Sequence, residues 1–510
     1  MINKKDGLME LALGLDVGTT TVKGGLFTRE GIPLAFASRK VNLLIPQPGW
    51  VEQDPQELWR AVIEICRQLV DQLPAGGKVC AISLSSQGGT TIPLDAGGNP
   101  THPAFSWMDG RAVDQASSAA ASLGEEWIYR TTGWSLMPGL PLNHIAWFRQ
   151  NCPQKFRRTA RFAFVNDYIL ARLGGQYWMD PSNASITQLY NLLDNAWDRQ
   201  LLDFAGIRED QLSPIRSSGA VVSCLTLSAA EQTGLEAGVP LVNGAHDQYC
   251  AAVAAGVTYP GEVLLSCGTA WVILVVPDRF QNAFCGGMCI SRHAVSGLWG
   301  GIRSMGGVGT SVEWLLDQIW GDIPQRTARF DALDRALAGT RPGAKGLIFI
   351  PLSGGHAVSA ELSNRGLLNL SLDHTRGDVA RALLEGITYE LDWMLEDIRS
   401  GFEIKRMKMI GGASRNPIWG QIIADVTGLP VELPSISETA SLGAALLAGV
   451  GVGWYPDIAS AAGKWVLSLK QKFPHPATQL EYQHTKQRYR RLWQILHEEG
   501  DFRPERKRLP

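Results

Sequence analysis

The segment 11-LALGLDVGTTTVKGGLFT-28 places a short turn of glycine and threonine between two apolar runs. These runs and the Gly18-Thr19-Thr20 turn predict a β-hairpin. Residues that lack a Cβ atom, or carry only a small hydroxyl side chain, let backbone N–H groups approach an oxyanion closely. The turn therefore fits either an ordinary hairpin or a phosphate-binding loop. Asp16, just before the turn, is placed to hold a nucleotide's Mg²⁺ through water, because Mg²⁺ dehydrates reluctantly.

The same pattern recurs about half a chain later in 262-EVLLSCGTAWVILVV-276, where Gly268-Thr269 separates two apolar runs. Two such units predict two halves of like architecture, each with its own sheet, flanking a cleft. Amphipathic helical patterns lie at 54–73, with Asp54 as the expected N-cap, and at 376–398. Strands that alternate with helices predict an α/β fold.

A domain boundary is expected near residue 255, where an Ala-rich helical stretch gives way to a Gly/Pro turn. We therefore predict an N-terminal domain over 1–255, a C-terminal domain over 256–455 and a helical tail over 456–510. The tail ends in the charge run 503-RPERKRLP-510, which is typical of a solvated chain end.

Composition narrows the class of partner. With 510 residues, 45% of them hydrophobic, the chain can bury a large core, which excludes a disordered protein. The net charge of −2 offers no basic excess for a nucleic acid or an anionic membrane, and no segment approaches the roughly 20 apolar residues of a membrane span. The eight cysteines are dispersed and the N-terminus lacks a secretion signal, so we expect a cytoplasmic protein with reduced thiols and a small-molecule partner.

Two further segments carry candidate chemistry. In 407-MKMIGGASRNPIWGQIIADVTG-428 an apolar strand runs into Gly411-Gly412 and then a helix. Such a turn lets a flat ring or a phosphate lie against the backbone, although tight packing of a helix on a strand would also explain it. In 241-LVNGAHDQYCAAVAAG-256 a Gly-Ala turn precedes Asp247 at a helix start. Asp247 is either a helix cap or, opposite a nucleotide, an acceptor for the proton of a hydroxyl nucleophile.

Neither a Walker-type P-loop nor a Rossmann glycine fingerprint occurs in the sequence. Taken in order, however, seven segments resemble the motifs of the FGGY family of carbohydrate kinases, and among its members the xylulokinases most. The resemblance covers roughly residues 10 to 455 and rests on GLDVGTTTVKG, PGWVEQDP, WMDGRA, GAHD, LSCGTAW, GGASRNPIWGQIIADVTGLPV and ETASLGAALLA. It implies the actin-like ATPase fold, with two ribonuclease-H-like domains on either side of an ATP and sugar cleft.

The resemblance also implies residue roles. Asp247 stands where the family has its catalytic base, and Asp16 where it has the aspartate near Mg²⁺. The implied ATP-binding residues are Gly18, Thr19, Thr20, Gly268, Thr269, Gly411, Gly412 and Asn416. The implied sugar-binding residues are Gln87, Gly88, Trp107, Asp109, Arg111, Asp247 and Gln248. For Trp107, Asp109 and Arg111 a second interpretation is an aromatic core residue with a structural Asp–Arg pair.

The expected activity is ATP- and Mg²⁺-dependent phosphorylation of a terminal hydroxyl of a ketose, with D-xylulose first and D-xylulose 5-phosphate as product. Alternatives are a kinase for ribulose, fuculose, glycerol, erythritol, gluconate or another ketose, polyol or sugar acid. A non-catalytic actin-like protein that binds sugar or nucleotide is a further alternative, and a homodimer is possible by analogy with relatives.

The sequence departs from the family pattern on the sugar side. Xylulokinases often carry Gln-Met-His-Gly where this chain has Gln87-Gly88-Gly89-Thr90, so two side chains that would touch a ketose are missing. A signature lysine of the family is His144 here. His246, next to the expected base, is interpreted either as a packed or hydrogen-bonded neighbour or as a sugar contact. The reaction class is therefore better defined than the substrate.

Overall fold

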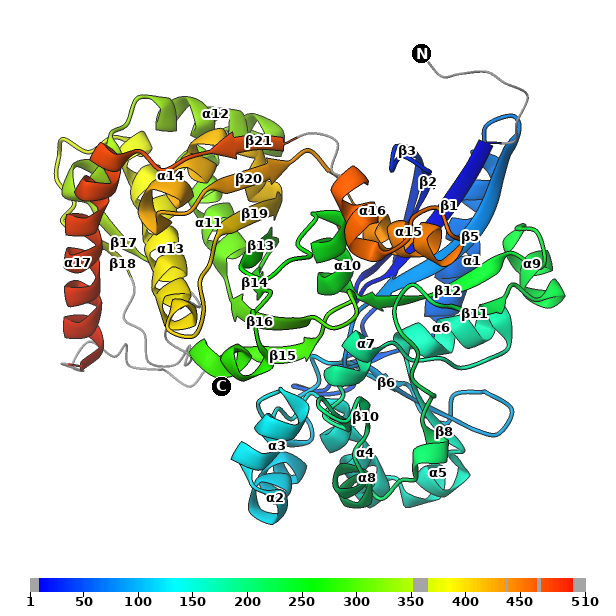
Figure 1. The fold of residues 1–510 in the computed structure, drawn as a ribbon. Coiled ribbons are helices and arrows are strands. Elements are labelled where there is room, and N and C mark those ends of the chain that lie inside the picture. The colour runs from blue at the N-terminus through cyan, green and yellow to red at the C-terminus, as the bar shows by residue number, and fades with distance from the viewer. Residues whose placement is uncertain (1–8, 352–365, 437, 466–468, 499–510) are drawn as a thin grey trace. The chain divides into compact units, whose positions relative to one another are not determined.

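The computed structural model describes residues 9–351, 366–436, 438–465 and 469–498 (Figure 1). Contacts between residues divide the chain into two units. The first unit comprises Met1–Tyr259, Cys289–Gly301 and Ile436–Leu467, and the second comprises Pro260–Met288, Ile302–Ser435 and Ser468–Pro510.

A six-stranded sheet forms the centre of the first unit, in the order β11-β12-β5-β1-β2-β3. β1 and β2 pair antiparallel, with Asp16 opposite Lys23, whereas β1, β5 and β12 run parallel. The hairpin predicted from the sequence is confirmed. The strands are β1 (Met9–Val17), β2 (Thr21–Thr28), β3 (Pro33–Lys40), β5 (Gly77–Ser86), β11 (Val221–Cys224) and β12 (Pro240–His246).

Two helices cover opposite faces of this sheet. α1 (Pro55–Asp71) packs on β2 and β3, and a Cβ atom added to Gly24 would meet it. α15 (Thr439–Gly451), orange in Figure 1, packs on β1 and β5, and a Cβ atom added to Gly14 would lie 1.9 Å from one of its carbonyl oxygens. Gly14 is paired with Gly25, the neighbour of Gly24, so Gly14 and Gly24 point to opposite faces.

A second, four-stranded sheet in the first unit has the order β4-β7-β6-β8. Its strands are β4 (Glu52–Gln53), β6 (Thr91–Leu94), β7 (Ala104–Phe105) and β8 (Arg161–Phe164). The remaining elements of this unit are α2 (Val113–Leu123), α3 (Glu125–Thr132), α4 (Pro141–Asn151), α5 (Pro153–Arg158), α6 (Val165–Gly174), α7 (Pro181–Ser185), β9 (Tyr190–Asn191), β10 (Ala196–Trp197), α8 (Arg199–Ala205), η1 (Glu209–Gln211), α9 (Leu227–Thr233), α10 (Asp247–Ala254), β15 (Cys289–Arg292) and α16 (Ile458–Trp465).

The second unit is built on a sheet that contains the strand order β16-β14-β13-β19-β20-β21. Its long helix α13 (Arg376–Arg399) is almost wholly buried. The strands are β13 (Glu262–Cys267), β14 (Trp271–Val275), β16 (Trp299–Met305, of which Ile302–Met305 belong to this unit), β17 (Ile348–Ile350), β18 (Gly366–Leu368), β19 (Arg406–Gly411), β20 (Val431–Pro434) and β21 (Leu469–Lys472). The other helices are η2 (Phe280–Gly287), α11 (Val308–Trp320), α12 (Arg326–Ala338), η3 (Pro342–Gly346), η4 (Gly412–Arg415), α14 (Pro417–Thr427) and α17 (Pro476–Glu498).

The two central sheets share one pairing pattern. In the first unit the antiparallel hairpin β1–β2 is followed by β5 and β12, both parallel to β1, and then by antiparallel β11. In the second unit the hairpin β13–β14 is followed by β19 and β20, both parallel to β13, and then by antiparallel β21. This repeated arrangement confirms the predicted α/β class and the two similar halves.

The contact-based units alternate along the chain and are therefore not the same divisions as the predicted domain ranges. Cys289–Gly301, within the predicted C-terminal domain, group with the first unit. Residues 436–455, which we predicted to belong to the C-terminal domain, group with the first unit. The physical reason is close backbone packing: Gly14 lets α15 approach β1, and Gly443 lets it approach the carbonyl of Cys250 on α10. The predicted tail is likewise divided, because α16 lies in the first unit and α17 in the second. The charge run 503–510 lies outside the described residues.

Two helix predictions are confirmed. α1 starts directly after Asp54, whose carboxylate accepts a hydrogen bond from the backbone N–H of Gln56 at 2.9 Å. α13 spans the whole stretch predicted at 376–398 and ends one residue later. Within the described ranges, none of the helices combines the length and the apolar character that crossing a membrane requires.

Candidate active site

The Gly18-Thr19-Thr20 turn joins β1 to β2 and is closed by a hydrogen bond from the Gly18 N–H to the Thr21 carbonyl, at 3.1 Å. Two side chains stabilise it, one from strand β4 and one from the WMDGRA loop. The indole Nε1 of Trp107 donates to Thr19 Oγ1 at 3.0 Å, and Gln53 Nε2 donates to the Thr19 carbonyl at 2.8 Å. The predicted phosphate turn is therefore mechanically linked to the predicted sugar loop.

Asp16 lies near the end of β1 and accepts a hydrogen bond from Ser85 Oγ at 2.8 Å. Burial, and then the negative charge of Asp247, raise the pKa of Asp16 to about 7, although the Ser85 hydrogen bond opposes this shift. Because the charge of Asp247 affects the pKa of Asp16, the predicted base and the predicted metal residue lie in one site in the first unit. In the part of the chain that the structure describes, no cluster of three or more His, Cys, Asp or Glu could hold a metal ion. A carboxylate with few protein partners suits Mg²⁺, which keeps water and phosphate ligands.

Asp247 is the first residue of α10 and follows β12 directly. Its Oδ1 is buried and has no hydrogen-bond partner among the described residues, and the same holds for His246 Nδ1 and Gln248 Oε1. An unpaired buried polar atom costs about 1–3 kcal/mol. Three of them in consecutive residues mark a place where the hydroxyl groups of a ligand would supply the missing partners.

The Gln87-Gly88-Gly89 segment follows β5 and lies next to these residues. Gln87 is buried, donates from Nε2 to Gln53 Oε1 at 2.9 Å and accepts from Thr90 Oγ1 at 3.4 Å. The space above Gly88 is already filled, since a Cβ atom there would lie 2.5 Å from Cδ2 of His246. The missing side chain at position 88 therefore leaves no empty room, because the imidazole ring takes its place.

The three sugar-binding candidates in the WMDGRA segment, Trp107, Asp109 and Arg111, lie in two different environments. Trp107 is 44% exposed and can present its ring to a ligand. Asp109 and Arg111 are fully buried and form an ion pair at 2.7 Å, which Glu52 extends at 2.8 Å. The guanidinium group also stacks 3.8 Å above the ring of Trp50. For Asp109 and Arg111 the structure favours the structural pair over direct sugar contact.

His144, which replaces the family's lysine, is a neutral core residue. Burial lowers the pKa of its imidazole to about 4, and its Nε2 lies 3.4 Å from the backbone carbonyl of Asp109. Its ring also stacks on Phe105 at 5.5 Å. The position therefore carries no positive charge at neutral pH.

In the second unit the Gly268-Thr269 turn joins β13 to β14. The start of α11 packs directly against it: the Gly309 N–H donates to the Thr269 carbonyl at 2.9 Å, and a Cβ atom on Gly309 would lie 2.7 Å from the carbonyl of Gly268. Gly307 precedes this helix in a left-handed conformation. Sequence reasoning missed Gly307 and Gly309, although the run GGVG at 306–309 is a visible glycine signal.

The nucleotide motif follows β19. Gly411 has a φ of +91°, and a Cβ atom there would lie 2.5 Å from the carbonyl oxygen of Cys267. Only glycine fits at this position because β13 lies so close, and this strand packing explains Gly411. Gly411 and Gly412 are themselves exposed, as a nucleotide-binding turn requires. Asn416 caps α14: its Oδ1 accepts from the N–H groups of Ile418 and Trp419, and its Nδ2 donates to Asp334 at 2.7 Å. Its side chain therefore orders the motif.

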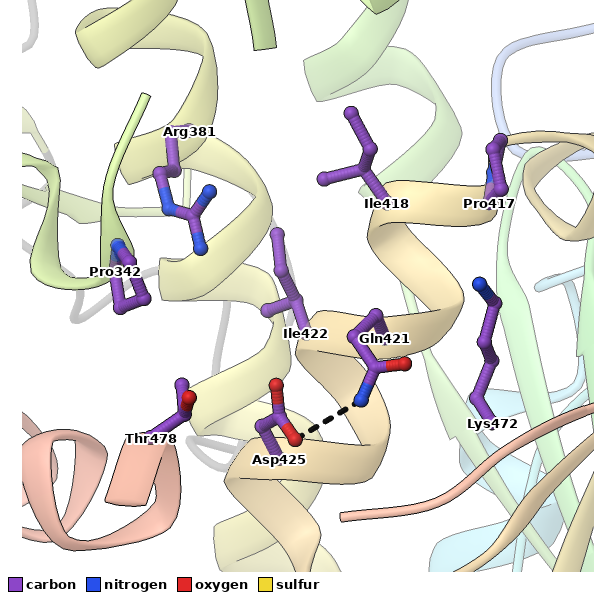
Figure 2. Close-up of a pocket in the computed structure, with 9 residues that line it drawn as sticks. All are labelled: Pro342, Arg381, Pro417, Ile418, Gln421, Ile422, Asp425, Lys472 and Thr478. Carbon is purple, nitrogen blue, oxygen red and sulfur yellow. Dashed lines mark hydrogen bonds between the residues drawn. The ribbon is translucent and has the colours of Figure 1, made fainter. Parts of the chain in front are cut away.

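A cavity of about 380 Å³ lies beside the first turns of α14 (Figure 2). Most of its charged groups are already paired. Arg381 donates to Glu385 at 2.7 Å and to Tyr482 at 2.8 Å, and Asp425 accepts from Gln421 at 3.0 Å, as the dashed line shows. The lining residues are Pro342, Arg381, Pro417, Ile418, Gln421, Ile422, Asp425, Lys472 and Thr478.

Two halves with the same strand pairing, each with a Gly-Thr turn between its first two strands, define an actin-like ATPase fold. The chain belongs to the FGGY family of carbohydrate kinases: residues 11–254 match the model of its N-terminal domain, and residues 263–452 match that of its C-terminal domain. Membership of this family implies ATP as the phosphoryl donor.

Characterised relatives differ in their sugars. The L-xylulose/3-keto-L-gulonate kinase of Escherichia coli K12 is 28% identical over 484 residues, which cover 94% of this chain and 96% of the relative. A xylulose kinase of Staphylococcus epidermidis is 29% identical over 461 residues, which cover 90% and 91%. The crystal structure of xylulose kinase from Rhodospirillum rubrum matches with a TM-score of 0.85 and 27% identity, over 96% of this chain and 99% of that one. The family is thus shared, while the names of the relatives span several substrates.

Proposed function

We propose that this protein transfers the γ-phosphoryl group of ATP to a terminal hydroxyl of a ketose, with D-xylulose as the first candidate and D-xylulose 5-phosphate as the product. The observation that carries the proposal is the unpaired, buried Oδ1 of Asp247 beside the high-pKa carboxyl of Asp16. In this proposal the Asp247 carboxylate accepts a proton, and Asp16 is the residue that would hold a divalent cation.

The proposed mechanism assigns one task to each group. Asp247 accepts the proton of the sugar hydroxyl as the oxygen attacks phosphorus. The backbone N–H groups of Gly18-Thr19-Thr20 and of Gly268-Thr269 hold the phosphate oxygens, and the glycine surface at Gly411 receives the nucleoside. Asp16 is the residue that would hold Mg²⁺, which would supply charge neutralisation at the phosphates. Positioning and charge neutralisation then supply most of the rate enhancement, since the protein forms no covalent bond.

The choice of D-xylulose rests on the likeness to xylulose kinases, and L-xylulose follows because the E. coli relative carries it in its name. The test is an ADP-release assay with ATP and Mg²⁺ over a panel of ketoses, polyols and sugar acids. We expect release with D-xylulose to exceed release without sugar by at least tenfold. Preference for another ketose or polyol would change the substrate assignment, and the protein would still be a carbohydrate kinase. No sugar-dependent release from any compound would overturn the proposal in favour of a non-catalytic binding protein.

We further propose a cytoplasmic location and a homodimer, which cell fractionation and light scattering of the purified protein would test. All eight cysteines are among the described residues, and each is a free thiol. The domain ranges 1–255, 256–455 and 456–510 also remain a proposal, to be compared with the sites where limited proteolysis cuts.

A further inference from the structure

The imidazole of His246 lies between Gly88 and Asp247. Its Nε2 is 2.9 Å from the place where a Cβ atom of residue 88 would be, and 3.4 Å from Oδ1 of Asp247. The side chain is 10% exposed, so the ring is held by its surroundings.

Strand pairing explains why these residues meet. His246 is the last residue of β12 and pairs with Ser86, the last residue of parallel β5, so Gly88 emerges beside it. The backbone N–H of His246 donates to Ser182 Oγ at 2.9 Å, and Ser182 in turn donates to the buried carboxylate of Asp180. The backbone under the imidazole is thus anchored to α7.

We infer that His246 is a positioning residue for the proposed base Asp247, and that position 88 is glycine because the imidazole needs its space. The inference rests on the proposed function. In the inferred arrangement, the Nε2–H group of His246 is directed at Oδ1 of Asp247 and fixes the orientation of that carboxylate. The second carboxylate oxygen then faces the sugar hydroxyl. At 3.4 Å the two atoms are within reach of each other, but they do not have the geometry of a hydrogen bond in this structure. Catalytic hydrogen bonds are often long in the free enzyme and tighten when substrate binds.

The first test replaces the histidine. His246→Ala should lower kcat about 10- to 100-fold with the sugar that the screen identifies, because misplacing a catalytic group by about 1 Å has an effect of this size. The KM for ATP should stay within about threefold. His246→Gln should restore most of kcat, since its amide keeps an N–H donor at a similar reach. A residue that only filled space would respond to side-chain size and not to the donor.

The second test is a double-mutant cycle. Gly88→Ala should lower kcat about tenfold in the parent protein, since its methyl group would displace the ring. In the His246→Ala background the same change should have no further effect, because the ring is gone. Gly463→Ala is the matched control, as a Cβ atom there meets nothing within 4 Å. Thermal unfolding of each variant reports whether it folds. If Gly88→Ala does not fold, the comparison of His246→Ala with His246→Gln decides the test alone.

Full kcat in His246→Ala, or multiplicative effects of the two substitutions, would overturn the inference. Failure of the proposed function has a different signature. Near-normal turnover in Asp247→Asn would remove the base assignment itself, whatever His246 does.

Discussion

Trp107 donates a hydrogen bond from its indole Nε1 to Oγ1 of Thr19, with the two atoms 3.0 Å apart. This contact joins a half-exposed ring of the predicted sugar loop to the predicted phosphate turn. In the proposed function, a sugar that moves the indole would therefore also move the side chain of Thr19.

Trp107→Phe should separate this coupling from ring packing, because phenylalanine keeps an aromatic face and loses the donor. We expect kcat/KM for ATP to fall about fivefold, which corresponds to one hydrogen bond of about 1 kcal/mol. Steady-state kinetics with both substrates varied would measure it. Thr19→Val should cause a similar loss, and the double variant no more than either single one. Additive losses would show that the two side chains act independently.

Asp247→Asn preserves the size of the side chain and removes the proton acceptor. We expect kcat to fall about 10²- to 10⁴-fold, the usual contribution of a general base. The thermal midpoint should remain close to that of the parent protein, since Oδ1 has no described protein partner to lose. Single-turnover measurements would show whether the loss lies in the chemical step. Unchanged transfer would exclude Asp247 as the base.

Arg111→Met should act on stability and not on sugar affinity. The substitution leaves the carboxylate of Asp109 buried without its cation, which typically costs about 3–5 kcal/mol. Urea unfolding should show a large decrease in the midpoint of the transition. The KM for sugar of the remaining folded enzyme should change little. A much higher KM at full stability would instead indicate that Arg111 touches the sugar.

Gly411→Ala should impair nucleotide use. The added methyl group would lie 2.5 Å from the carbonyl of Cys267, at a φ of +91° that strains any other residue by about 1–3 kcal/mol. We expect the KM for ATP to rise about tenfold and the KM for sugar to stay unchanged. Gly287 is the matched control, because it also has a positive φ, of +61°, and its Cβ atom would meet nothing within 4 Å. Equal effects of the two substitutions would contradict this assignment.

Asp167 should make the stability of the protein depend on pH. Burial raises the pKa of this carboxyl from 3.8 to about 7, against the hydrogen bonds from Ser213 and the Phe164 N–H. Between these values the folded state retains a proton that the unfolded state releases, so stability falls as pH rises. Asp167→Asn removes this contribution. Its thermal midpoint relative to the parent should therefore be higher at pH 8 than at pH 5, and an equal difference at both pH values would refute the assignment.

Local patterns made much of the fold predictable. The Gly-Thr turns are flanked by apolar strands on both sides, and α1 carries its own cap at Asp54, so each signal lies within a short stretch. The return of α15 to the first unit could not be predicted in this way. Its sequence indicates a helix of small residues, whereas its partners Gly14 and Cys250 are far away in the chain.

In the candidate site, too, some features are signalled within a short stretch of sequence and others depend on distant residues. Asp247 and the glycine turns stand in recognisable motifs, and the structure brings Asp247 together with Asp16. The pairing of Asp109 with Arg111 over Trp50 depends on a loop from another part of the sequence. The fit of His246 above Gly88 depends on the register of β5 and β12, which composition and periodicity do not determine.

The late position of α15 has a consequence for biosynthesis. While the ribosome is making the chain, β1 and β5 emerge early, yet the helix that covers the Gly14 face comes only with Thr439–Gly451. The Gly14 face of the sheet, which carries Ala12 on β1 and Ala81 and Ser83 on β5, therefore stays uncovered until α15 has been made. The first unit can reach its native state only after that helix has emerged, although β1 is among the first elements to be made.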